Sequence, residues 1–266
     1  MKTLTLYIVA LCLCLSACKK IISIDVDNAA AQMVIEANIT DKLADQQIRI
    51  TKSVAYSDQS IYPKVSGANV TVTDGKGNNY IFAEKEPGLY VNKMKGESGV
   101  TYNLKVTAEN KTYTASSTMP QTVKLDSVGI ISNNFFGKER KTAAAYLTDP
   151  VETANYYHFY LYVNGMISNR IYVFDDRLTN GNKLRLQLYY EKNDDDDEGL
   201  KSGDKVSVEM ECVDVNIFKY WYALSQQSGR GPNQGTTPSN PTSNISNNAL
   251  GYFSAHSYQR IGITVP

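Results

Sequence analysis

The sequence is poor in cysteine and histidine. It contains four cysteines and two histidines in 266 residues, and only Cys212 lies beyond the first eighteen positions. A lone thiol cannot form an intramolecular disulfide, so the body must be held together by its core. No zinc-ligand spacing, phosphate-binding loop or Gly-x-Ser-x-Gly elbow is present. We therefore expect a protein without catalytic residues, metal or cofactor, not an enzyme.

The sequence also lacks a net charge and a long hydrophobic run. Its 27 basic residues balance 27 acidic ones, which gives no bias toward nucleic acid as a partner. The apolar run from Leu4 to Leu15 is shorter than the roughly 20 residues that a membrane-spanning helix needs. Membrane association, if it occurs, must then come from an attached lipid.

The first eighteen residues are typical of an export signal. Lys2 precedes the apolar run, and the small residues Ser16 and Ala17 follow it. The segment Leu15-Ser16-Ala17-Cys18 resembles the bacterial lipobox, in which the cysteine is acylated and becomes the mature amino terminus. Because two or more acyl chains give stable attachment, this pattern predicts a lipid-anchored protein.

These observations divide the amino-terminal region. We expect a lipoprotein signal peptide over residues 1–17, lipidation of Cys18 with chains such as palmitate, and a lipid anchor and tether over residues 18–32. An alternative is that Ile21, Ile22 and Ile24 dock on the first domain as a strand.

Residues 33–119 alternate between apolar and polar side chains. Val100, Tyr102, Leu104 and Val106 share one face of a strand, and polar residues stand between them. Turn signals such as Asp74-Gly75 and Pro87-Gly88 separate about seven such runs. This spacing predicts an immunoglobulin-like or transthyretin-like β-sandwich.

Residues 120–266 predict a second β-rich domain with one amphipathic helix. Pro120 ends the first pattern, and residues 121–127 are interpreted as the crossing between domains. A helix near 215–227 is indicated by a cap at Asp214 and an apolar stripe. The stripe consists of Ile217, Tyr220, Trp221 and Leu224.

A binding surface is expected on loops. Tyrosine provides rigid amphipathic contact area; core packing accounts for most of the 19 tyrosines, but Tyr56 and Tyr62 flank a predicted loop. Residues 228–248 are rich in Gly, Pro, Ser, Thr and Asn, and such a long loop is generally functional or disordered. We therefore select Tyr56, Tyr62, Asn240 and Asn244 as candidate binding residues.

The acidic run at residues 194–199 allows two interpretations. Asp194, Asp196 and Glu198 fall at positions one, three and five of a calcium-binding loop. However, the twelfth position is Lys205, and the flanking runs are typical of strands. A solvated hairpin tip is favoured over a looser calcium site. The two histidines, His158 and His256, lie in aromatic strand-like runs and are interpreted as packed strand residues.

Several phrases together resemble a known family. Besides the lipobox, they are Val65 to Val72, Pro87-Gly88-Leu89-Tyr90, Tyr113 to Pro120, Asn240 to Ile245 and Leu250 to Ala255. They are similar to a Bacteroidota outer-membrane lipoprotein family of unknown function, usually encoded beside TonB-dependent receptors. The resemblance implies a part in nutrient capture or uptake, with such a receptor as partner and an unknown ligand. It carries no catalytic or ligand-binding residues.

The same resemblance bears on location and modification. Surface-exposed lipoproteins of these bacteria carry acidic residues after the acylated cysteine, whereas here Lys19-Lys20 follows it. We expect an outer-membrane protein whose periplasmic or cell-surface face is undecided. Asp126-Ser127-Val128 resembles the O-glycosylation signal of these bacteria, which makes Ser127 a candidate site.

The leading function is thus a non-catalytic accessory to a TonB-dependent receptor. The alternatives are a structural or adhesive envelope protein and a hydrolase with unrecognised carboxylates.

Overall fold

The computed structural model describes residues 30–55, 61–135, 137–190, 199–227 and 239–266. In its first seven strands, buried and more exposed side chains largely alternate. In β6 (Thr101–Ala108), Tyr102, Leu104 and Val106 are buried, and Asn103 and Lys105 between them are exposed. The other six are β1 (Met33–Thr40), β2 (Ala44–Lys52), β3 (Asn69–Asp74), β4 (Asn79–Glu86), β5 (Leu89–Met94) and β7 (Lys111–Thr118). The predicted number of strands in this region is confirmed.

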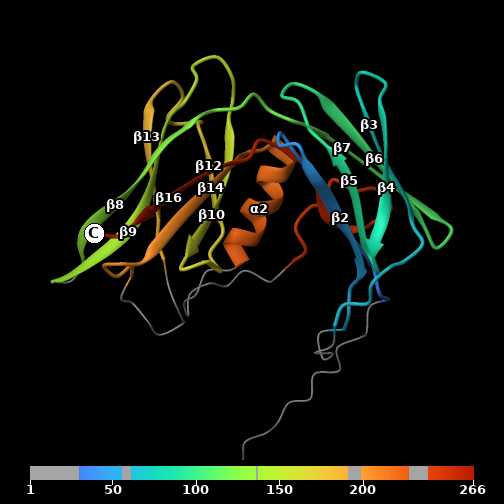
Figure 1. The fold of residues 1–266 in the computed structure, drawn as a ribbon, viewed down its shortest axis with the longest axis horizontal. Helices are drawn as coiled ribbons and strands as arrows, with labels where there is room; N and C mark the ends of the chain where they lie inside the picture. Colours follow the sequence, from blue (N-terminus) through green and yellow to red (C-terminus); the bar gives the residue numbers. More distant parts are fainter. Residues whose placement is uncertain (1–29, 56–60, 136, 191–198, 228–238) are drawn as a thin grey trace, which may run out of the picture. The chain divides into compact units, whose positions relative to one another are not determined.

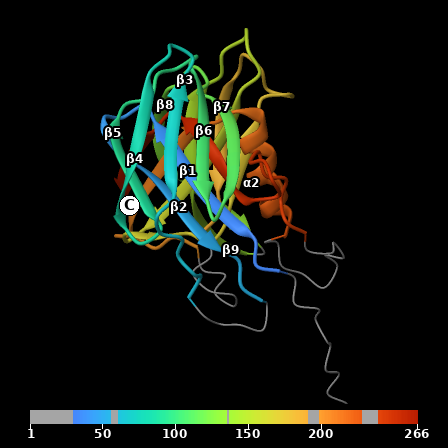
Figure 2. The same cartoon turned by 90° about the vertical axis from the view of Figure 1, so that its right-hand side faces the viewer.

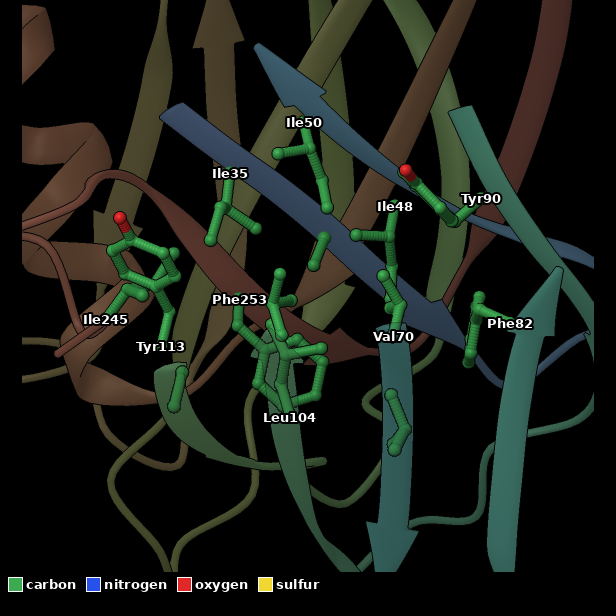
Figure 3. Close-up of a cluster of buried hydrophobic side chains, with 14 of the residues drawn as sticks. Ile35, Ile48, Ile50, Val70, Phe82, Tyr90, Leu104, Tyr113, Ile245 and Phe253 are labelled. Atoms are coloured by element: carbon green, nitrogen blue, oxygen red, sulfur yellow. The ribbon is translucent and has the colours of Figure 1, made fainter. Parts of the chain in front are cut away.

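These strands belong to one sheet that folds over into two layers (Figures 1 and 2). The strand order is β15-β1-β2-β5-β4-β3-β6-β7, and β4 shifts register against β5 between Glu84 and Glu86. The two edges approach each other, because Ala255 of β15 donates its N–H to the hydroxyl of Ser117 on β7 at 2.9 Å. The core between the layers takes side chains from every strand, including Ile35, Leu104 and Phe253 (Figure 3).

Strand β15 (Leu250–His256) reaches this sheet from the far end of the chain. It runs parallel to β1, and Leu250 lies opposite Val34 in the register. Its approach is close at Gly251, which has a φ of 91°. A Cβ there would lie 2.0 Å from the carbonyl oxygen of Ile35, so this position of β15 requires glycine.

The remaining strands form two smaller sheets. One has the order β11-β10-β14-β16 with β12 also paired to β10, and the other has the order β13-β9-β8. A second core, which includes Tyr157, Phe159 and Leu161, lies among them. The strands are β8 (Leu125–Phe135), β9 (Lys138–Thr148), β10 (Tyr156–Val163), β11 (Met166–Ile167), β12 (Tyr172–Asp175), β13 (Lys183–Leu188), β14 (Lys205–Cys212) and β16 (Gln259–Thr264). For the residues that the structure describes, the mainly β class with one helix is confirmed.

Helix α2 (Val215–Gln227) begins where its sequence predicts, but its buried face differs in part from the predicted stripe. The Asp214 carboxylate accepts the backbone N–H groups of Asn216 at 2.9 Å and Ile217 at 3.1 Å, which satisfies two donors of the first turn. Ile217 is buried with Phe218, which the predicted stripe omitted, and Trp221 packs against the same cluster. Among the described residues, no helix is long and apolar enough to cross a membrane.

Candidate functional site

A groove of about 590 Å³ opens on the outer face of the eight-stranded sheet. Its position follows from the alternation of β1, where Ile35 and Ala37 point into the core, so that Val34 and Glu36 lie on the opposite face. The register places Leu250 of β15 and Thr51 of β2 on either side of Val34. The described lining consists of Val34, Glu36, Thr51, Ser53, Val54, Ala55, Tyr62 and Leu250.

The chemistry of the groove suits binding. Among its described lining residues, Glu36 is the only one that carries a charge. Tyr62 is 61% exposed, and its neighbour Ile61 is 86% exposed. Exposed aromatic area beside apolar walls is characteristic of contact surfaces. The described lining can thus contact a partner through an aromatic ring, apolar side chains and one carboxylate.

A second polar feature is the buried cluster of His158, Glu211, His256 and Ser254. The Nδ1 of His158 lies 2.9 Å from Oε2 of Glu211, and the Nε2 of His256 lies 3.2 Å from Oε1 of the same carboxylate. The Nδ1 of His256 lies 2.8 Å from the Ser254 hydroxyl. All four residues are buried. Both histidines are thus packed strand residues, as the sequence predicts.

Glu211 and His256 shift each other's pKa in opposite directions. Burial alone would raise the pKa of Glu211, but the charge of His256 and hydrogen bonds from both histidines outweigh it and hold the pKa well below its usual value. Burial alone would lower the pKa of His256, but the charge of Glu211 and their hydrogen bond raise it above its usual value. These opposite shifts favour an ionised Glu211 beside a protonated His256.

Ser254, His256 and Glu211 are connected in the sequence serine–histidine–carboxylate that serine hydrolases use. Unlike the serine of such an enzyme, Ser254 is not accessible to a substrate. Ser254 is 1% exposed and His256 is 3% exposed, so a substrate cannot reach the hydroxyl. A nucleophile must contact the bond that it attacks. The cluster therefore has a structural role in this conformation. Among the residues described, no group of three or more histidine, cysteine or acidic side chains is placed to hold a metal ion.

The four candidate binding residues selected from the sequence lie in different environments. Tyr62 lines the groove, and Asn240 is exposed. The Asn244 side chain instead pairs with Phe253 of β15, donating to its carbonyl at 2.8 Å and accepting its N–H at 2.9 Å. Asn244 thus extends the edge of β15. Tyr56 lies outside the described residues.

Three further predicted sites also differ in outcome. Ser127 is exposed, but it lies in β8 rather than in a crossing segment, because β8 already begins at Leu125. The proposed calcium ligands Asp194, Asp196 and Glu198 lie outside the described residues, as does Cys18.

The other residues that line the groove were not predicted from the sequence, and neither was Glu211, which contacts both histidines. Glu36 and Leu250 come together only because β1 pairs with β15 in parallel. Glu211 was not selected from the sequence as a candidate residue. Its position between the apolar residues Met210 and Cys212 was the available signal that it needs a partner. A carboxylate at a buried strand position requires a partner, and this signal could have directed attention to the two histidines.

Comparison with known proteins places the chain in a family. The model of the family described as "Domain of unknown function (DUF4249)" matches residues 19–261. Because this match covers most of the chain, the protein belongs to that family. No curated protein matches the sequence significantly.

Proposed function

We propose that this member of the DUF4249 family is an outer-membrane lipoprotein that serves a TonB-dependent receptor as a non-catalytic accessory in nutrient capture or uptake. The observation that carries the proposal is the groove beside Tyr62 and Glu36 on the outer face of β1 and β15. Its described lining offers aromatic and apolar contact area to a partner. The receptor, or the nutrient that it takes up, is the expected occupant.

The position of the groove in the chain supports a membrane-anchored role. Val34 is the second residue of β1, so the groove opens close to where the expected tether joins the body. A tether over residues 18–32 can extend to roughly 50 Å. Lipid on Cys18 would keep the body within that reach of the membrane and raise its effective concentration near a membrane receptor.

The burial of Ser254 and His256 supports a non-catalytic role over the hydrolase alternative. In the described part of the chain, His256 contacts both Ser254 and Glu211, and all three side chains are buried away from solvent. The groove, which is open, has only Glu36 as an ionisable acid among its described lining residues.

The anchor is tested by Cys18→Ser in the native host. The wild-type protein is expected in the outer-membrane fraction with a lipid-sized mass increment on its amino terminus, and the variant is expected to lose both. An unmodified wild-type amino terminus would refute the lipoprotein assignment.

The partner is tested by crosslinking in native membranes, followed by affinity purification of the full-length protein. A TonB-dependent receptor, identified by mass spectrometry, is expected with the wild type and should be depleted with the double variant Glu36→Gln, Tyr62→Ala. Tyr222→Ala is the matched control, because Tyr222 is a 48% exposed tyrosine on α2 outside the groove lining. Absence of any such receptor from the wild-type sample would contradict the accessory role. Equal recovery with the double variant would show that the groove is not the contact.

A further inference from the structure

The buried cluster lies where strands of two different sheets meet. His256 belongs to β15, which is the strand beside β1 in the eight-stranded sheet, whereas Glu211 and His158 belong to β14 and β10 of the second sheet. Glu211 uses one oxygen for each histidine, at 3.2 Å and 2.9 Å. The carboxylate therefore connects two sheets that share no strand.

We propose that His158, Glu211 and His256 form a pH-dependent latch that holds β15 against the second sheet and helix α2. In the closed latch, protonated His256 and ionised Glu211 neutralise each other. Loss of the proton from His256 leaves the carboxylate charge buried without a counter-charge and weakens the attachment.

Helix α2 seals the latch from water. The Trp221 ring stacks on His158 with 4.6 Å between centroids and an interplanar angle of 14°, and it meets Tyr252 of β15 at 5.2 Å. Tyr160 meets the His158 ring in an edge-on arrangement, with centroids 4.5 Å apart. Because water is excluded, the ion pair acts in a low dielectric and is strong, and an unpaired charge in the same place is costly. The position of Trp221 thus depends on the protonation of the cluster.

The other groups around His256 favour its protonated form. Glu209, on the same face of β14, and Asp41, in the turn after β1, both act electrostatically to raise the pKa of His256. Arg260 of β16 partly compensates Glu209, whose pKa it lowers. Three tyrosines of the packed elements have pKa values that burial raises, so they stay neutral in this range: Tyr160 of β10, Tyr220 of α2 and Tyr252 of β15.

The direction of the pH effect follows from these charges. His256 has a raised pKa in the folded protein, so its contribution is complete below the ordinary value of 6.5 and is lost as the pH rises through the raised value. Glu211 has a lowered pKa, so its contribution is complete above the ordinary value of 4.5 and is lost as the pH falls through the lowered value. The latch is therefore strongest in mildly acidic solution, weakens in alkali, and would also open in strong acid.

The first test needs no substitution, because His158 and His256 are the only histidines in the chain. The ring signals of both are followed by NMR during a pH titration of the folded wild-type protein. One histidine is expected to titrate with a midpoint above 6.5. Titration of both rings at or below that value would overturn the proposal.

The second test uses Trp221, the only tryptophan in the chain, as a reporter of the seal. Quenching of its fluorescence by acrylamide is expected to increase as the pH rises above 6.5 and His256 loses its proton. In Glu211→Gln this step should disappear, and the His256 midpoint should fall, because the charge of Glu211 and its hydrogen bond are the largest causes that raise the pKa of His256. Glu97→Gln, an exposed acid outside the cluster, is the matched control and should keep the step. A wild-type protein without the step, or a Glu211→Gln protein that keeps it, contradicts the latch.

Discussion

The hydroxyl of Ser117 on β7 donates a hydrogen bond to the carboxylate of Asp214, the residue that caps helix α2. The same hydroxyl accepts the N–H of Ala255 on β15. Ser117 thus connects the two edges of the eight-stranded sheet to the start of the helix. The helix is consequently fixed at its first turn by the sheet and, through Trp221, by the buried histidine cluster.

Asp214→Ala is expected to destabilise the protein. The substitution removes the acceptor for two N–H groups of the first turn of α2 and for the Ser117 hydroxyl. Loss of such a cap costs about 0.5–2 kcal/mol, which urea unfolding can measure. Asn216→Ala is the control, because its side chain is exposed. An effect of Asn216→Ala as large as that of Asp214→Ala would argue against capping as the cause.

Gly251→Ala is expected to disrupt the pairing of β15 with β1. The new Cβ would lie 2.0 Å from the Ile35 carbonyl oxygen, and the residue would keep a positive φ. We expect a loss of about 3 kcal/mol or more in unfolding free energy, or failure to fold. Gly262→Ala on β16 is the matched control, because its nearest contact would lie 3.6 Å away. Similar unfolding curves for the two variants would show that β15 does not pack this closely.

Tyr90→Phe tests the support of the segment before β3. The Tyr90 hydroxyl donates to the Val65 carbonyl and accepts the N–H of Ala68, each at 2.9 Å. Its removal leaves both backbone groups without this partner and should cost about 1–3 kcal/mol in thermal or urea unfolding. Tyr189→Phe should be nearly neutral, because Tyr189 is 39% exposed and water can replace the hydrogen bond from its hydroxyl to the Gln187 side chain. A neutral Tyr90→Phe would mean that water replaces the hydroxyl.

Glu209→Gln is expected to change the pH dependence of stability. Burial and the charge of Glu211 raise the pKa of Glu209, so its ionisation opposes folding as the pH rises above the ordinary value of 4.5. The glutamine variant should therefore be as stable as the wild type at acidic pH and more stable at neutral pH. Thermal unfolding across this range measures the difference. A variant that is less stable at neutral pH would show that the pairing of Glu209 with Arg260 outweighs the cost of burial.

Much of the local structure could be predicted from the sequence. The alternation of Tyr102, Leu104 and Val106 follows from the two faces of a strand, and Asp214 marks the start of α2 through the chemistry of a helix cap. Both signals need only neighbouring residues. Of the described residues that line the groove, only Tyr62 was selected from the sequence. This was possible because an aromatic residue beside a loop can be recognised from its neighbours in the sequence.

Tertiary structure alone decided how these elements meet. The parallel pairing of β15 with β1 brings Leu250 beside Val34 in the groove, and it brings His256 to Glu211. Nothing in the local pattern of Leu250 to His256 specifies β1 as the partner, because any strand with a matching apolar face satisfies the same alternation. The choice depends on which arrangement fills the core and pairs the buried charges, and that is a property of the whole folded chain.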